Sequence, residues 1–268
     1  MYESIFIYDF IPSFLLSSFF LIINIIFSIQ FSKNNYIKKL FFFNEFQPIV
    51  IFYLIFCLYI FFFNLVVIVN YKFISEIFYL ILFLQILLIF LNIKDKKFNF
   101  NFDLKIDGIL VLIVFFSLFL ISILPLSDAD SISLYQYLPT VIYNQGLKEI
   151  DFYQNLEFTL LSNTEILLLI SPILKTDNFG SVLNLITLVF FVLINFKNHK
   201  NFIFIIFSSP LIIYFISAQK LQLFFGLLYL LSFILINKKL ITKKWELFVF
   251  ILLLTFYSSG KISYILLS

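Results

Sequence analysis

Residues 48–93 read PIVIFYLIFCLYIFFFNLVVIVNYKFISEIFYLILFLQILLIFLNI, and this stretch decides the fold class. Its only charged residues, Lys72 and Glu76, lie at a short polar interruption between two apolar runs. A helix needs about 20 mostly apolar residues to cross the hydrocarbon core of a bilayer. The stretch therefore predicts two membrane-spanning helices, at 48–70 and 74–93, joined by a tight turn.

The whole chain has the same character, because 62% of its residues are hydrophobic and only 12% are charged. Soluble domains contain about 45–50% apolar and about 25% charged residues. One soluble core of this size could not bury so much apolar surface, whereas lipid can solvate it. We therefore expect an all-α, polytopic membrane protein with about eight or nine transmembrane helices. The remaining spans are expected at 10–32, 108–126, 178–196, 201–217, 221–237 and 245–260, with a ninth beginning at Ile262.

One long polar loop, residues 127–164, separates the fourth and fifth predicted spans. Within it, residues 131–145 predict an amphipathic helix with Tyr135, Leu138 and Ile142 on one face and Gln136 away from it. The following apolar piece, 166–174, is too short to cross a bilayer, and we expect a re-entrant or interfacial helix there, stopped by Ser171-Pro172 and Lys175.

The lysines fix the expected orientation, because most of the 18 basic residues, all lysine, fall in one alternate set of loops. Lysine-rich loops face the cytoplasm. The amino terminus and the 127–164 loop are then expected on the periplasmic side of a bacterial inner membrane. The single cysteine excludes a disulfide within the chain, and no basic cluster with interleaved aromatics predicts nucleic-acid binding.

Asp128 and Asp130 are the principal candidate site residues, because they follow directly after a predicted span. Two carboxylates this close can provide a general base with a raised pKa, or share a divalent cation such as Mg²⁺ or Mn²⁺. The alternative is structural, with Asp130 capping the helix that follows and Asp128 as an exposed charge.

Further candidates for substrate binding are Glu165 and the pair Gln219-Lys220. Glu165 lies near membrane level, where acids tend to be functional, but Ser162-Asn163-Thr164-Glu165 also fits a capping box. Lys220 lies in a tight outward turn and can bind a lipid phosphate as a point charge, or extend to the lipid headgroups.

The sequence Asp128-Ala129-Asp130-Ser131, followed by Tyr137-Leu138-Pro139, resembles the first external loop of GT-C glycosyltransferases of the bacterial mannosyltransferase-like or oligosaccharyltransferase-like branch. Residues 216–224 and 260–264 are also similar to segments of such proteins. The resemblance covers 108–268 and leaves 1–107 as an additional region with three spans. It departs from the family in lacking a histidine near Tyr137 and in ending within a span, as a truncated member would.

The resemblance implies an enzyme that transfers a sugar from a polyprenyl-phosphate carrier to a cell-envelope glycan or lipid acceptor. Asp128 or Asp130 would be the catalytic base and the ligand of any divalent cation, and Lys220 would bind the donor phosphate. The alternatives are a polysaccharide polymerase or lipid-linked glycan transporter, and a membrane subunit without catalytic activity.

Overall fold

The computed structural model of this protein describes residues 10–92, 106–123, 135–147, 162–195 and 209–260. All regular structure in these ranges is helical, which confirms the all-α prediction. The longer helices begin and end within a few residues of the predicted spans. The described helices are α1 (Phe10–Ser32), α2 (Asn35–Leu40), η1 (Asn44–Phe46), α3 (Gln47–Asn70), η2 (Tyr71–Phe73), α4 (Ile74–Asn92), α5 (Ile106–Ser122), α6 (Leu138–Gln145), α7 (Asn163–Leu167), α8 (Ile170–Leu174), α9 (Phe179–Asn195), α11 (Pro210–Ser217), α12 (Gln222–Asn237) and α13 (Lys244–Gly260).

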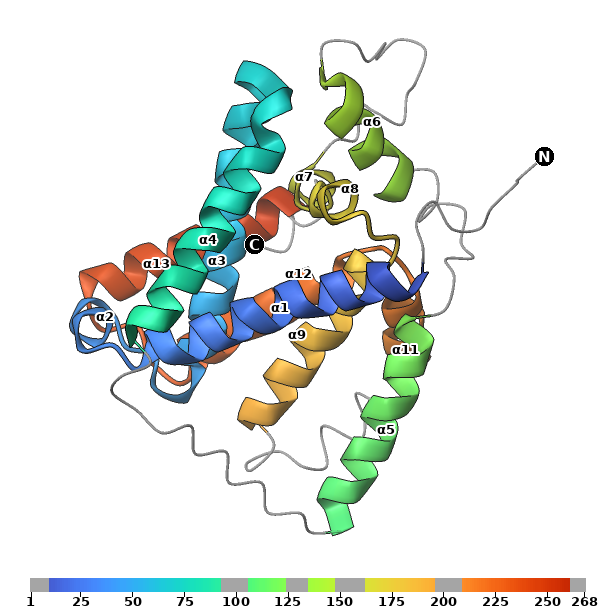
Figure 1. The fold of residues 1–268 in the computed structure, drawn as a ribbon. Helices are drawn as coiled ribbons and strands as arrows, with labels where there is room; N and C mark the ends of the chain where they lie inside the picture. The colour runs from blue at the N-terminus through green and yellow to red at the C-terminus, as the bar shows by residue number, and fades with distance from the viewer. Residues whose placement is uncertain (1–9, 93–105, 124–134, 148–161, 196–208, 261–268) are drawn as a thin grey trace.

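The two helices of the 48–93 stretch form a hairpin, α3 and α4, against which α1 packs (Figure 1). The hairpin turns at η2, where the Asn70 side chain accepts a hydrogen bond from the backbone N–H of Lys72 at 3.2 Å. The Tyr59 hydroxyl and Gln85 Oε1, which lie equally far in sequence from the turn, are 3.1 Å apart. The two helices therefore run antiparallel, as the sequence predicted.

Within the described ranges, fewer helices are long and apolar enough to span a membrane than the eight or nine expected. Among the described residues, two helical segments are long and apolar enough to cross a membrane, Pro12–Ser32 and Asn44–Leu91. A third is added if the bent pair Asn163–Leu174 and Phe179–Val192 counts as one span. The physical reason is length, because α12 has only 16 residues and a helix rises about 1.5 Å per residue, short of a core about 30 Å thick.

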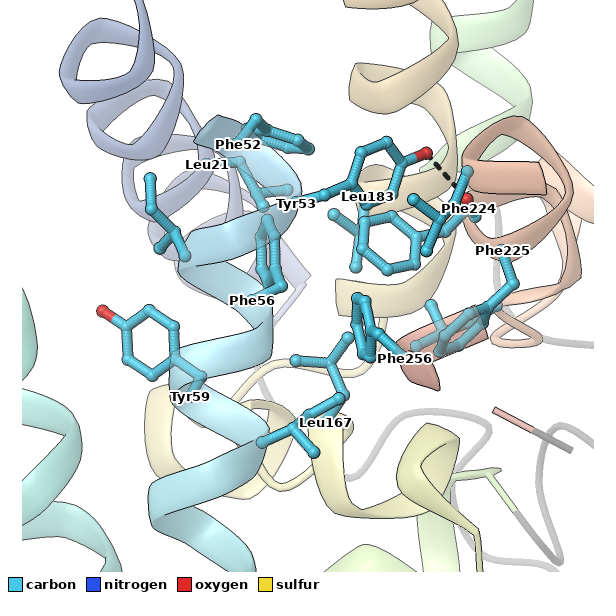
Figure 2. Packing of buried hydrophobic residues seen from close by; sticks show 14 of the residues in the cluster. Leu21, Phe52, Tyr53, Phe56, Tyr59, Leu167, Leu183, Phe224, Phe225 and Phe256 are labelled. Carbon is cyan, nitrogen blue, oxygen red and sulfur yellow. Dashed lines mark hydrogen bonds between the residues drawn. The ribbon is translucent and has the colours of Figure 1, made fainter. Parts of the chain in front are cut away.

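An aromatic core connects the N-terminal hairpin to the C-terminal helices (Figure 2). Phe52, Tyr53 and Phe56 project from α3 and are fully buried. The Tyr53 hydroxyl donates a hydrogen bond to the carbonyl of Phe224, at the start of α12, at 2.8 Å. The predicted division into 1–107 and 108–268 stays a prediction, and this core runs across it.

The outward faces of α3 and α4 carry large exposed apolar side chains, among them Phe61, Ile68, Phe83 and Phe90, each more than half exposed. Water would solvate such a surface poorly, whereas lipid is an adequate solvent for it. These faces support association of the protein with a membrane.

The helix predicted within 131–145 is present as α6, described from Tyr135 onward. Tyr135, Leu138 and Ile142, which were predicted to share one face, are all buried, and Gln136 is buried too, at 4% exposure. The helix ends at Gly146, where φ is +77° and an added Cβ would lie 2.4 Å from the Tyr71 ring. Because α6 packs on η2, α7 and α8, its apolar face contacts protein.

Candidate functional site

The helical pair formed by α7–α8 and α9 breaks between Leu174 and Phe179, where the chain bends by 111°. Contrary to the prediction, α8 continues through Ser171 and Pro172, but it ends before Lys175 as predicted. Lys175 adopts the left-handed conformation, with φ +53°, and the Thr176 N–H donates to the Ser171 carbonyl at 2.9 Å. This is a common way to close a helix end. The predicted re-entrant piece is therefore one arm of a sharply bent helical pair, a geometry that fits both a re-entrant loop and a broken span.

Asp177 lies inside this break and is only 2% exposed. One of its carboxylate oxygens accepts a hydrogen bond from the Gln136 side-chain amide, and its backbone N–H donates to the Ser13 hydroxyl at 2.9 Å. A buried carboxylate is tolerated where hydrogen bonds replace water, and the N-terminus of α9 just after it also favours negative charge. Asp177 thus joins α1, α6 and α9.

The next residue, Asn178, connects the break to α5. Its side-chain amide donates to the carbonyl of Ser122, the last residue of α5, at 3.3 Å. The break therefore contacts both Ser122, just before residues 124–134, and Gln136, just after them.

The connection between α11 and α12 closes the other side of the break. Gln219 is fully buried, and its side-chain oxygen accepts from the Gly180 N–H at 2.8 Å while its amide nitrogen donates to the Ser171 hydroxyl at 3.0 Å. The Ser181 hydroxyl donates to the Ala218 carbonyl at 3.1 Å. We call the buried polar region formed by residues 176–184 and 218–221 the polar junction.

Asn184 holds the junction together from within α9. Its amide nitrogen donates to the carbonyls of Phe215, at 2.8 Å, and Lys220, at 2.5 Å, while its oxygen accepts from the Phe224 N–H at 3.0 Å. These backbone groups flank the turn between α11 and α12. One fully buried side chain thus satisfies three of the backbone groups that the turn leaves free.

Lys220 is only 7% exposed. Its ammonium group donates to the hydroxyl of Tyr214 at 2.6 Å and lies 5.1 Å from the centre of that ring. Tyr214 itself is 42% exposed, so the pair connects the interior of the junction with the surface of α11. An ammonium beside a phenol hydroxyl can bind an anionic oxygen.

The predicted substrate-binding residues do not all lie together. Gln219 and Lys220 belong to the polar junction, whereas Glu165 lies at the start of α7. There Glu165 completes a capping box, accepting from the Ser162 N–H at 2.7 Å, and the Ser162 hydroxyl also donates to the carbonyl of Gly260 at 2.6 Å. Of the two predicted roles for Glu165, the structure displays capping.

Asp128 and Asp130 lie outside the described residues, so their predicted roles as base or cation ligands stay predictions. Within the described ranges, no group of three or more His, Cys, Asp or Glu side chains could hold a metal ion.

Asp177 and Asn184 in the junction, and Gln136 beside it, were not predicted from the sequence as site residues. Asp177 looked like an ordinary loop acid between two apolar runs, and Asn184 like an isolated polar residue in a span. The available signal was an ionisable residue directly before a predicted span, a position that favours function.

Comparison with known proteins gives the chain no relative. No family model matches it, and neither the curated proteins nor the solved structures contain a significant match.

Proposed function

We propose that this chain is a membrane glycosyltransferase that moves a sugar from a polyprenyl-phosphate carrier to a glycan or lipid acceptor of the cell envelope. Transfer would take place at the periplasmic face of a bacterial inner membrane, as the lysine distribution predicts. The apolar faces of α3 and α4 support a location in lipid, where such a carrier is dissolved.

One observation carries the proposal. Ser122 and Gln136 flank the segment that contains Asp128 and Asp130, and both are hydrogen-bonded to the consecutive residues Asp177 and Asn178. The flanks of the predicted acidic motif are thereby fixed at a buried polar region beside a broken helix. Polar groups at such a break are typical of substrate sites in membrane proteins.

Two buried hydroxyl groups, one in the junction and one in α1, are suited to a sugar. The hydroxyls of Ser17 in α1 and Thr176 in the break are fully buried and have no hydrogen-bond partner among the described residues. Ser17 lies one helical turn after Ser13, which binds the Asp177 backbone. Buried hydroxyls normally have partners, and the hydroxyls of a sugar can supply them.

In the proposed reaction, Asp128 or Asp130 takes the proton of the acceptor hydroxyl. The acceptor oxygen bonds to the anomeric carbon of the donor sugar while the bond from that carbon to the phosphate oxygen breaks. The polyprenyl phosphate leaves with the electron pair, and attack from the opposite face inverts the anomeric carbon. Lys220, with the Tyr214 hydroxyl, would bind the phosphate, and the carboxylates would hold any divalent cation that the reaction requires.

Substitution of the two acids tests this proposal. Membranes containing Asp128→Asn or Asp130→Asn are incubated with a radiolabelled polyprenyl-phosphate hexose, and label transferred to membrane acceptors is counted. Loss of general-base help should slow transfer by about 10²–10⁴-fold for whichever residue is the base. Glu45→Gln, which removes an exposed carboxylate in η1, is the matched control and should retain transfer. Normal transfer by both Asp variants would exclude them from the mechanism.

The broken helix gives specific support to one alternative, a transporter of lipid-linked glycans, because discontinuous helices are common at transport sites. Proteoliposomes containing a fluorescent polyprenyl-linked sugar discriminate between the two functions. Movement of the intact lipid between leaflets without release of polyprenyl phosphate would favour transport. Release of polyprenyl phosphate that depends on an acceptor would favour transfer.

A further inference from the structure

Two segments from opposite ends of the chain form one edge of the molecule (Figure 1). One is residues 33–46, between α1 and α3, and the other is residues 238–246, between α12 and the first turn of α13. Together they contain seven lysines and only two acids, Glu45 and Glu246. We call this surface the basic edge.

Glu246 fixes the two segments to each other. Its carboxylate is 2% exposed, and one oxygen accepts from the Phe42 N–H at 3.1 Å. The other oxygen accepts from the N–H groups of Thr242 and Lys243, each at 2.8 Å, and from the Thr242 hydroxyl at 2.9 Å. Burial raises the pKa of Glu246, but these hydrogen bonds outweigh it and hold the pKa below its usual value. Glu246 is therefore ionised at neutral pH.

A second contact lies beside the first. The Lys238 ammonium forms a 2.8 Å ion pair with Glu45 and lies 4.6 Å from the centre of the buried Phe46 ring. This pair is exposed and contributes little by itself. It occupies Lys238 and Glu45, however, so the charge available at the surface comes from the other lysines.

Those lysines project beside exposed apolar and aromatic side chains. Tyr36 is 77% and Trp245 57% exposed. Exposed basic residues interleaved with aromatic rings are typical of protein surfaces at the level of lipid headgroups. On the basic edge, the exposed lysines with no ion pair among the described residues are Lys38, Lys39, Lys239, Lys243 and Lys244. The exposed apolar side chains of the edge also include Leu40 and Phe42.

The position of the edge matches this chemistry. The first candidate span ends at Ser32 and the second begins at Asn44. Residues 33–46 of the basic edge therefore lie at the end of one apolar segment and the start of the next. A surface at that level meets the headgroups of the surrounding lipids. Its excess of positive charge selects those with a net negative charge.

We propose that the basic edge is a binding site for anionic phospholipid headgroups, preorganised by Glu246. Lysine ammonium groups bind the lipid phosphates, while Tyr36 and Trp245 lie among the headgroups and upper acyl chains. The proposal is independent of glycosyl transfer, because it requires only that the protein is embedded in lipid.

The test uses the full chain in dodecyl maltoside micelles, titrated with phosphatidylglycerol, phosphatidylcholine or inorganic phosphate. The readout is the shift of the thermal unfolding midpoint, because a ligand that binds only the folded state raises it. Phosphatidylglycerol should raise the midpoint, and the other two should not. The variant K38Q/K39Q/K243Q/K244Q should bind phosphatidylglycerol at least about tenfold more weakly.

The matched control is K72Q/K175Q, which removes two exposed lysines outside the basic edge and should leave the response unchanged. An unchanged response of the quadruple variant, or an equal loss in the control, would overturn the proposal. So would a response to inorganic phosphate as large as that to phosphatidylglycerol.

Two further variants isolate the role of Glu246. Glu45→Gln and Glu246→Gln each remove one negative charge from the basic edge, so charge alone predicts stronger binding of anionic lipid by both variants. If Glu246 organises the site, Glu45→Gln should strengthen binding and Glu246→Gln should weaken it several-fold. Stronger binding by both variants would overturn the organising role, and Glu45→Gln remains informative if Glu246→Gln fails to fold.

Discussion

Across the N-terminal helices, one set of buried polar residues bonds side chain to side chain, whereas in the polar junction the buried amides bond mainly to backbone groups of other segments. Asn24, Tyr59 and Gln85 form a chain across α1, α3 and α4, with the Gln85 amide 3.2 Å from Asn24 Oδ1 and its oxygen 3.1 Å from the Tyr59 hydroxyl. In the junction, Asn184 and Gln219 instead bind carbonyl and N–H groups of the neighbouring segment.

The difference follows from helix continuity. A continuous helix satisfies its own backbone, so a polar side chain on it commonly bonds to another side chain or to its own preceding turn. The breaks at 175–178 and 218–221 leave backbone groups that water cannot reach, and side-chain amides must bind them. Polar residues thus join helices in the first region and repair broken helices in the second.

The largest expected effect is at Asn184. Asn184→Leu keeps similar volume but leaves two carbonyls and one N–H without their partner, so unfolding free energy should fall by about 3 kcal/mol or more. The measurement is far-UV circular dichroism during SDS titration of the micellar protein.

Thr187→Val is the matched control, because the Thr187 hydroxyl binds only the Leu183 carbonyl of its own helix, at 2.7 Å. Its stability should remain close to that of the wild type. Equal effects of the two substitutions would contradict the distinction between broken and continuous helices.

A smaller loss is expected from Gly180→Ala. The new Cβ would lie 2.4 Å from the Gln219 carbonyl oxygen, which is backbone and cannot rotate away, so α9 and the 218–221 turn must separate. We expect a loss of about 2 kcal/mol in the same titration. Gly226→Ala in α12, where an added Cβ meets nothing within 4 Å, should instead be neutral or slightly stabilising. If Gly180→Ala were as stable as the wild type, the close approach of Gly180 to the Gln219 carbonyl would be contradicted.

The smallest effect is expected at Gln85. Gln85→Leu removes the middle residue of the hydrogen-bonded series Asn24–Gln85–Tyr59. Hydrogen bonds between membrane helices contribute only about 1 kcal/mol to the free energy of unfolding. Combining it with Tyr59→Phe should add less than the sum of the single losses, because both remove one shared bond. A loss at Gln85 as large as that at Asn184 would show that the two regions do not differ in kind.

Helix positions were predictable because they depend on local order of apolar residues. The 48–93 run, interrupted by Asn70-Tyr71-Lys72, indicated the hairpin, and Ser162 and Glu165 indicated the capping box that the structure contains. The polar junction could not be predicted in the same way. The residues that meet there, Gln136, Asp177 and Gln219, are far apart in sequence. No local sequence pattern indicates that two breaks in different helices will lie in contact.

Composition and the lengths of the apolar runs are enough to indicate an all-helical chain with more apolar surface than a soluble core could bury, because both are local properties of the sequence. The tertiary structure was needed to fix the residues at which each helix begins and ends, because caps and turns set them. It also decided that an aspartate before α9 becomes buried and that two lysine-rich turns share one edge, because both depend on contacts between residues distant in the chain.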